Sequence, residues 1–308
     1  MRVLRLNDSV GGSRLSEQDA PVPVAAAGEL LIRVHAAGVT PTELLWYPTS
    51  HTKSGEKRGG AVPAHEFSGV VAAAGKDVGC LEVGQEVFGM HDWFADGAMA
   101  DYCITEFASV APKPGNLSHA EAASIPIGAL TAWQGLFDRA NLQPGERVLV
   151  HGGAGAVGAL AIQLARFRGA RVITTAATRN RDFVMSLGAE QVVDYENSRF
   201  EEYVRDVDVV FDTVGGETLE RSWSVLGPQG RMVTIAANGE NATGERVKNA
   251  FFIVEPNQKQ LTEIGGLLET GQLKPVVDTV IPLAEAPQAY TGQMKRRGCG
   301  KIIVTVAG

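Results

Sequence analysis

The sequence has no excess of positive charge and no long apolar run, and each absence excludes a class of protein. Its 28 Lys and Arg residues are outnumbered by 35 Asp and Glu residues, which gives a net charge of −7. A general nucleic-acid or anionic-membrane binder needs the opposite balance, because neutralising phosphates requires excess Lys and Arg. No stretch approaches the roughly 18 apolar residues of a membrane span, and the first residues lack the pattern of a signal peptide. We therefore expect neither nucleic acid nor a membrane as a partner.

Cysteine is also scarce. Cys80, Cys103 and Cys299 are an odd number and show no pairing pattern, so the sequence does not predict a disulfide framework. Free thiols are typical of a reducing compartment, and we expect a cytoplasmic protein.

The residues that are present divide the chain near Ser118. Before it, short β-rich runs alternate with Gly and Pro, as in LLIRVHAAGV and FSGVVAAAG, which predicts an antiparallel or barrel-like unit. After it, apolar strands such as RVLVHG and VDVVFDTV alternate with helical patterns, which predicts a doubly wound parallel sheet. The polar stretch 241–249 is typical of a loop. A chain of 308 residues suits two domains, and we expect an α/β protein.

A glycine motif follows the first strand of the parallel sheet. HGGAGAVG contains Gly153, Gly155 and Gly158 with the spacing GxGxxG, between a strand and a helix. The first glycine allows a tight turn, the second lets the backbone approach a pyrophosphate, and the third allows close packing of the helix. The helix N-terminus at Ala156 and Val157 offers unpaired N–H groups to the anion. The motif therefore predicts a dinucleotide-binding site.

The end of the second strand indicates which dinucleotide binds. An NAD site places an acidic residue there for the ribose 2′-hydroxyl. This chain has VITTAATRNRDF, with Thr178, Arg179 and Arg181 and no Asp or Glu at the strand end. A guanidinium can grip a phosphate, so the stretch favours NADPH. Alternatively, these arginines only face solvent beside a helix N-terminus, where cations are unfavourable.

Several motifs together resemble one enzyme family. They are HAAGVTPTE, AHEFSGVV, AASIPIGALTAWQGL, VLVHGGAGAVGALAIQLA, FDTVGG and GKIIVTV, in this order over nearly the whole chain. The sequence is similar to the medium-chain dehydrogenase/reductase superfamily, and within it to the zinc-free quinone oxidoreductases, the zeta-crystallin-like group. The resemblance implies a GroES-like catalytic domain at 1–119 and a Rossmann domain at 120–256. It also implies that 257–308 returns to the catalytic domain, and that a homodimer forms through the sheet edge at 231–237.

The resemblance also bears on metal binding. The zinc-dependent relatives hold the catalytic zinc with residues at the positions of Thr40, His65 and Ile127. Only His65 is a ligand type that zinc accepts at such a site, which needs three protein ligands and water. The loop that carries four cysteines in those relatives has only Cys103 here. We therefore expect no metal, with His65 as a hydrogen-bonding residue at the rim of the cleft and Glu66 as a structural residue.

To oxidise an alcohol without a metal, the protein would need another group that stabilises the alkoxide. The sequence has no Tyr-x-x-x-Lys motif that could take the place of the metal. Reduction of a quinone or an α,β-unsaturated carbonyl needs only alignment and a hydrogen-bond donor near the oxygen. Thr40, Tyr47 or water could be that donor. The expected substrate pocket contains His65, Trp46, Trp93 and Phe94.

The resemblance implies further cofactor contacts beyond the glycine motif and Thr178 and Arg179. They are Thr131, Asp212, Thr213, Phe252 and Val254. The leading hypothesis is an NADPH-dependent quinone or enone reductase. The alternatives are a zinc-type alcohol dehydrogenase and a non-catalytic, crystallin-like NADPH-binding protein.

Overall fold

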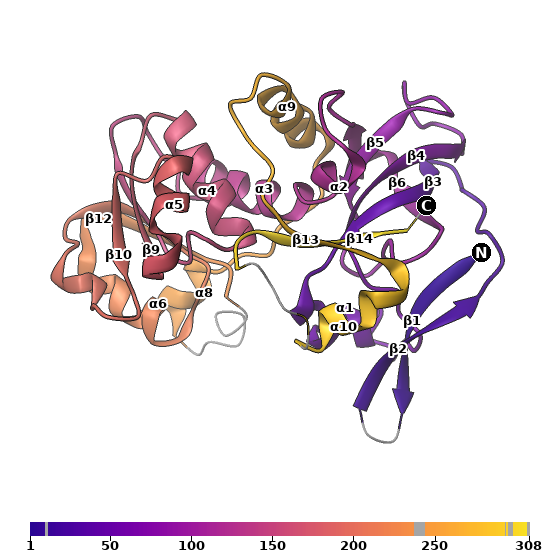
Figure 1. Ribbon diagram of the computed structural model, residues 1–308, viewed down its shortest axis with the longest axis horizontal. Helices are drawn as coiled ribbons and strands as arrows, with labels where there is room; N and C mark the ends of the chain where they lie inside the picture. Colours follow the sequence, from indigo (N-terminus) through magenta and orange to yellow (C-terminus); the bar gives the residue numbers. More distant parts are fainter. Residues whose placement is uncertain (10–11, 237–243, 293, 295–297, 307–308) are drawn as a thin grey trace.

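The computed structural model describes residues 1–9, 12–236, 244–292, 294 and 298–306, and the chain forms two parts (Figure 1). A β-rich part contains both ends of the chain, and an α/β part lies beside it (Figure 1). The predicted α/β fold class is confirmed. Among the described residues, no helix has both the length and the apolar character needed to cross a membrane.

The β-rich part is built on a seven-stranded sheet in the order β13-β14-β3-β4-β5-β7, with β6 paired to β3. Its strands are β3 (Glu29–Gly38), β4 (Glu66–Ala74), β5 (Glu86–Met90), β6 (Tyr102–Glu106), β7 (Val110–Pro112), β13 (Val277–Pro282) and β14 (Lys301–Thr305). An antiparallel hairpin of β1 (Arg2–Ser9) and β2 (Gly12–Asp19) extends from this part (Figure 1).

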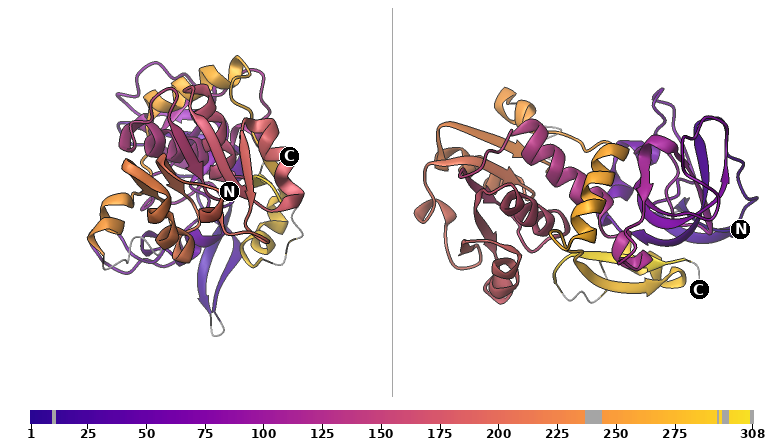
Figure 2. Two further views of the ribbon diagram at one scale, coloured as in Figure 1. Left: turned by 90° about the vertical axis from the view of Figure 1, so that its left-hand side faces the viewer. Right: turned by 90° about the horizontal axis from the view of Figure 1, so that it is seen from above.

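The C-terminal strands complete the first sheet. β14 pairs antiparallel with β3, so that Val304 faces Ala37, and β13 pairs parallel with β14. The two strands run across the molecule from the α/β part to the β-rich part, as Figure 2 shows from above. The sheet that carries Thr40 and Glu66 is therefore assembled from segments at opposite ends of the sequence.

The α/β part is built on a five-stranded parallel sheet in the order β10-β9-β8-β11-β12. The strands are β8 (Arg147–Val150), β9 (Arg171–Ala176), β10 (Gln191–Asp194), β11 (Val207–Asp212) and β12 (Leu226–Thr234). Val148, Leu149 and Val150 are all fully buried. Burial of successive residues shows that helices and loops cover both faces, as continuous apolar strands predict.

Helices connect the strands and join the two parts. The α-helices are α1 (Tyr47–Ser50), α2 (His119–Ala122), α3 (Pro126–Trp133), α4 (Ala156–Phe167), α5 (Arg181–Leu187), α6 (Gly216–Ser222), α8 (Glu245–Ala250), α9 (Gln258–Glu269) and α10 (Ala286–Tyr290). Ser118 begins α2 with a capping box, in which its side chain accepts from the Glu121 N–H and the Glu121 carboxylate accepts from the Ser118 N–H. α3 is almost wholly buried and packs against α4.

Two local predictions need correction. The stretch 241–249 was expected to be a loop, but 245–250 forms α8, which packs against β12, and 241–243 lies outside the described residues. The edge strand expected at 231–237 ends at Thr234, where Phe251 forms a parallel bridge and the Phe252 N–H donates to the Thr234 carbonyl. Segment 251–252 therefore covers the end of β12, and Ala237 lies outside the described residues.

A buried histidine links the parallel strands. His151 follows β8 and is fully buried, with Nδ1 3.1 Å from Thr175 Oγ1 and Nε2 2.9 Å from Ser222 Oγ. Burial lowers the pKa of His151 to about 4. The imidazole is therefore neutral in the folded protein at neutral pH.

We predict that acid destabilises the α/β part through His151. The unfolded chain takes up a proton near pH 6.5, whereas the folded chain does so only near pH 4. The stabilisation is therefore complete above pH 6.5 and is lost as the pH falls towards 4, by up to about 3 kcal/mol. Urea unfolding at several pH values should show this loss in the wild type, and a smaller dependence on pH in His151→Gln. Equal dependence in both proteins would contradict the prediction.

Candidate functional site

The glycine loop has the close packing that the motif predicts. A Cβ at Gly158 would lie 2.2 Å from the Gly152 carbonyl oxygen, and one at Gly153 would lie 2.1 Å from Thr174 Oγ1. Gly155 is the N-cap of α4, and no side chain caps the first turn. The N–H groups at the start of α4 are therefore available to an anion, and the loop fits a dinucleotide pyrophosphate.

The loop is also tied to the C-terminal segment. Gly155 forms a parallel bridge with Gly300, whose N–H donates to the Ala154 carbonyl at 3.1 Å. The chain enters β14 at the next residue, Lys301. The loop expected at the pyrophosphate and the last strand of the β-rich sheet are thus in direct contact.

Acidic side chains from outside β9 lie at the end of this strand, which the sequence alone did not indicate. Arg179 is 67% exposed and pairs with Glu196 at 2.9 Å. The Thr178 hydroxyl donates to the carboxylate of Asp194, which is the last residue of the neighbouring strand β10. Two acidic residues therefore lie beside the expected 2′-phosphate position, although neither belongs to β9.

Asp212 and Thr213 lie at the carboxyl end of β11, as expected, but they bond within the protein. The fully buried Asp212 carboxylate accepts from the Val214 and Gly215 N–H groups and from the Thr234 hydroxyl at 2.7 Å. The Thr213 hydroxyl donates to the His151 carbonyl at 2.8 Å. Asp212 thus holds the turn after β11, and Thr213 supports the glycine loop.

Trp93 connects the two parts of the molecule. Its Nε1 donates to the Val254 carbonyl at 2.9 Å, while its ring packs against His65 at 5.1 Å and Trp46 at 4.9 Å between centroids. Phe252 and Val254 are both buried. Trp93 therefore links two other residues expected at the substrate pocket to the segment expected at the nicotinamide. Thr131 is buried on α3, with its hydroxyl bonded to the Ile127 carbonyl.

A cluster of polar groups includes Thr40 and His65, two of the three positions that the resemblance equates with zinc ligands in relatives. We call it the buried polar cluster; its members are Thr40, Glu43, His65, Glu66, Tyr290 and Lys301. Lys301 is 6% exposed, forms an ion pair with Glu66, and donates to Thr40 Oγ1 at 3.1 Å. The other oxygen of Glu66 accepts from the Ile127 N–H at 2.9 Å. Burial raises the pKa of Glu66, and the Lys301 ammonium opposes that change.

His65 forms the second half of this cluster. Its Nδ1 lies 2.7 Å from the fully buried carboxylate of Glu43, and its Nε2 lies 3.3 Å from the Ala95 carbonyl oxygen. Glu43 also accepts from Tyr290 Oη at 2.7 Å and from the Ala64 N–H at 3.1 Å. Burial and the Glu43 carboxylate raise the pKa of Tyr290 well above its usual value, so the phenol remains a donor.

The expected place of His65 at the rim needs correction, because the residue is 5% exposed and enclosed by Glu43 and Trp93. Tyr47 lies further out. It is 52% exposed, its ring stacks on His51, and it contacts Phe94 edge-on at 6.5 Å. The geometry therefore favours Thr40 over Tyr47 as a donor inside the cleft.

The sequence reading missed Glu43, Tyr290 and Lys301. Glu43 lies in the short 3-10 helix η1 (Pro41–Leu45), three residues after Thr40 in an otherwise apolar stretch. Lys301 opens the apolar strand KIIVTV. The only indication in the sequence was a charged residue within or beside an apolar stretch. This indication does not reveal which residue the charge pairs with.

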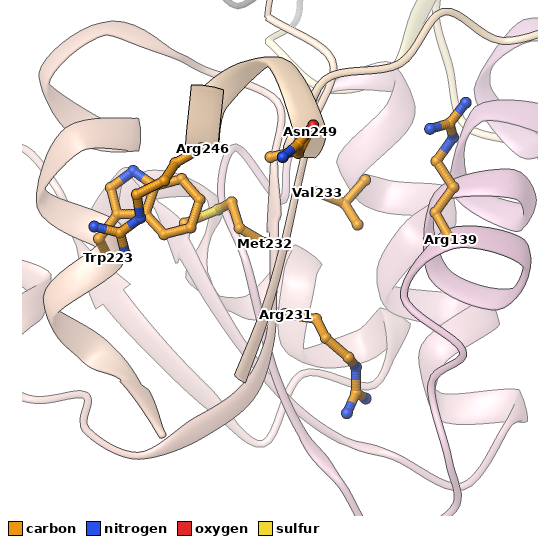
Figure 3. Close-up of a pocket in the computed structure, with 8 residues that line it drawn as sticks. Arg139, Trp223, Arg231, Met232, Val233, Arg246 and Asn249 are labelled. Carbon is orange, nitrogen blue, oxygen red and sulfur yellow. The ribbon is translucent and has the colours of Figure 1, made fainter. Parts of the chain in front are cut away.

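A separate cavity of about 470 Å³ lies at the edge of the parallel sheet, between β12 and α8 (Figure 3). Arg246 stacks over Trp223 at 4.3 Å, Arg231 pairs with Glu146, and Arg139 lies across the pocket. None of its lining residues belongs to the expected cofactor or substrate site. We therefore place the candidate active site at the glycine loop, Trp93 and the buried polar cluster.

Comparison with known proteins identifies the family. Residues 26–115 match the alcohol dehydrogenase GroES-like domain, and residues 187–304 match the zinc-binding dehydrogenase family. The chain is 33% identical over 322 residues to the probable zinc-binding oxidoreductase, mitochondrial, of Arthroderma benhamiae, covering 98% of this chain and 96% of that protein. The chain belongs to the medium-chain dehydrogenase/reductase superfamily.

Other members of this superfamily are similar over most of the chain. The 2-methylene-furan-3-one reductase of Solanum lycopersicum is 33% identical, with 94% of this chain and 74% of that protein covered. The solved structure of the quinone oxidoreductase from Coxiella burnetii is 30% identical, with a TM-score of 0.87 and coverage of 100% of this chain and 99% of that one. The protein is an oxidoreductase of the quinone oxidoreductase-like type.

We predict that Lys301 and Glu66 stabilise the fold only as a pair. Lys301→Met leaves the Glu66 carboxylate buried and uncompensated, which should cost about 3–5 kcal/mol in the free energy of unfolding. Adding Glu66→Gln keeps an acceptor for the Ile127 N–H and removes the unpaired charge. Urea unfolding of the double variant should recover most of the loss. A Lys301→Met protein as stable as the wild type would contradict the pairing.

Proposed function

We propose that the protein transfers hydride from NADPH to the electron-poor carbon of a quinone or an α,β-unsaturated carbonyl. The observation that carries this proposal is the pairing of Thr40 with Lys301 in the buried polar cluster. Lys301 donates to Thr40 Oγ1, so the Thr40 hydroxyl hydrogen is free to bond another acceptor. A hydroxyl that accepts from an ammonium becomes a stronger donor, and it suits the oxygen on which negative charge develops.

The cofactor fits the residues that are present. The glycine loop and the start of α4 would hold its pyrophosphate, and Thr178 and Arg179 its adenosine phosphate. Segment 252–254 and Thr131 would border the nicotinamide, which supplies the hydride. The protein then aligns the acceptor against the aromatic side chains of Trp46 and Trp93 and excludes water from the cleft.

We infer that this reaction runs without zinc. Of the three positions that correspond to zinc ligands in relatives, Ile127 is apolar and buried, and Thr40 is bonded to an ammonium. The Nδ1 atom of His65 is bonded to Glu43. The segment that matches the zinc-binding dehydrogenase family, 187–304, contains none of these three positions. An ammonium next to the expected metal position also opposes binding of a cation.

Three further features remain proposals. The homodimer implied by the family resemblance is one of them; β12 is the last strand of the parallel sheet, and edge strands invite pairing. The domain limits 1–119, 120–256 and 257–308 agree with the membership of β13 and β14 in the first sheet. The cytoplasmic location rests on the odd number of cysteines and their lack of a pairing pattern in the sequence, whereas the Arthroderma benhamiae relative is named as mitochondrial.

We predict that NADPH binds more tightly than NADH and that Arg179 contributes to the difference. Arg179→Ala should weaken NADPH about 10- to 100-fold and leave NADH nearly unchanged, because only NADPH carries the phosphate that the guanidinium grips. Fluorescence titration measures both affinities. Arg171→Ala is the matched control, since Arg171 is an exposed arginine that pairs with Glu190 at the opposite end of β9. Equal affinities for the two cofactors would refute the proposal.

We predict that the purified protein oxidises NADPH with quinones or enones, keeps this activity in chelator, and leaves simple alcohols unreacted with NADP. Thr40→Val should lower turnover about 10²-fold, as expected for the loss of one donor to a developing oxyanion. Tyr47→Phe should change turnover little, because Tyr47 is exposed. Oxidation of benzyl alcohol that is lost in chelator would indicate a zinc-type alcohol dehydrogenase. Silence with every acceptor would favour a non-catalytic protein.

A further inference from the structure

We propose that His65 is the general acid of this enzyme, delivering a proton from Nε2 to the carbon next to the carbonyl of an enone substrate. The inference rests on the proposed function and adds to it the residue that completes the reduction. Nothing in the comparisons gives His65 a role in proton transfer.

The hydrogen-bond geometry sets the protons on the ring. Nδ1 faces the Glu43 carboxylate at 2.7 Å, and Nε2 faces the Ala95 carbonyl oxygen at 3.3 Å. Both neighbours are acceptors, and Glu43 already receives two other hydrogen bonds from Tyr290 and Ala64. The Nε2 contact requires a proton on Nε2, and the Nδ1 contact requires one further proton between the imidazole and the Glu43 carboxylate.

The charge of the cluster favours the same form. Glu43 and Glu66 are both fully buried, and Lys301 supplies one positive charge, which pairs with Glu66. One proton shared between His65 and Glu43, beyond the one that Nε2 donates, balances the two carboxylates against the Lys301 ammonium. A buried group of charges is stable only when it is compensated, so the cluster holds a transferable proton on His65.

The other donors in the cluster are less suited to give up a proton. Lys301 must keep its charge because it faces Glu66 and Thr40. Loss of a proton from Thr40 would create an alkoxide. Deprotonation of His65 leaves a neutral imidazole whose Nδ1–H remains bonded to Glu43, the arrangement typical of acid–base histidines.

The position of His65 places it beside the expected nicotinamide. Trp93 packs on the imidazole and donates to the Val254 carbonyl, so a single side chain separates His65 from the cofactor segment. The contact from Nε2 to Ala95 is the longest in the cluster, at 3.3 Å. A substrate atom can replace this contact at the smallest cost.

The step balances as follows. Hydride transfer would break the C4–H bond of NADPH, leave NADP+, and form a C–H bond at the β-carbon. The alkene electron pair would then shift toward the carbonyl oxygen, and the resulting enolate oxygen would bond Thr40. The His65 Nε2–H bond then breaks, its electron pair stays on nitrogen, and a C–H bond forms at the α-carbon. Water returns a proton to Nε2 before the next turnover.

The test uses full-length protein, NADPH and 2-methylcyclohex-2-enone in D₂O, with product configuration and deuterium at the α-carbon as readouts. The wild type should give one enantiomer, because a fixed acid protonates one face. His65→Gln should lower kcat about 10²-fold, the low end for loss of a general acid. It should also give a nearly racemic α-carbon while NADPH binds as tightly as before. Deuterated NADPH should still label one face of the β-carbon.

His119→Gln is the matched control, because His119 is another enclosed histidine of the β-rich part that bonds Ser68 and lies outside the cleft. It should retain kcat and configuration. If His65→Gln does not fold, Glu43→Gln serves as the second variant and should lower kcat without changing NADPH affinity. A racemic α-carbon from the wild type, or unchanged kcat and configuration in a folded His65→Gln protein, would overturn the inference. Wild-type protein inert to this enone and to quinones would instead refute the proposed function.

Discussion

The ion pair between Lys301 and Glu66 is the interaction on which the site depends. Lys301 begins the last strand, Glu66 begins β4, and Glu66 also holds the first turn of α3 through the Ile127 N–H. The pair thus joins the C-terminal strand, the catalytic sheet and the first long helix of the α/β part. It also fixes Thr40, because the same ammonium donates to the Thr40 hydroxyl. Desolvation makes such a pair unfavourable unless every polar atom has a partner, and here the neighbouring elements supply those partners.

The helices, strands and loops that could be predicted from the sequence are those that depend on residues close together in the chain. The glycine spacing after RVLVHG predicted a strand, a tight loop and a helix, and the packing around Gly153 and Gly158 agrees with that prediction. The alternation of apolar strands and helices predicted the parallel sheet. Both signals arise from residues close together in the chain, where backbone geometry decides the outcome.

The contacts among the charged residues of the buried polar cluster could not be predicted from local sequence patterns. Tyr290 and Glu43 are 247 residues apart in the sequence, and Lys301 and Thr40 are 261 apart. No periodicity links such residues: the pairing of β14 with β3 brings Lys301 to Thr40, and the packing of α10 against η1 brings Tyr290 to Glu43. The same limit applies to Glu196, which lies beyond the next strand and nevertheless partners Arg179. A strand end without an acid is therefore an incomplete guide to the charge around an adenosine site.

The bridge between Gly155 and Gly300 has a consequence for biosynthesis. Gly300, which contacts the glycine loop, directly precedes Lys301, whose ammonium enters the buried polar cluster. A ribosome that has produced β3, β4 and the whole parallel sheet has still not made β14, so both sites remain unfinished in the nascent chain. Until β14 docks, Glu66 lacks the Lys301 ammonium that compensates its charge in the folded protein. Docking of the C-terminal strand therefore completes the glycine loop contact and the buried polar cluster in one late folding step.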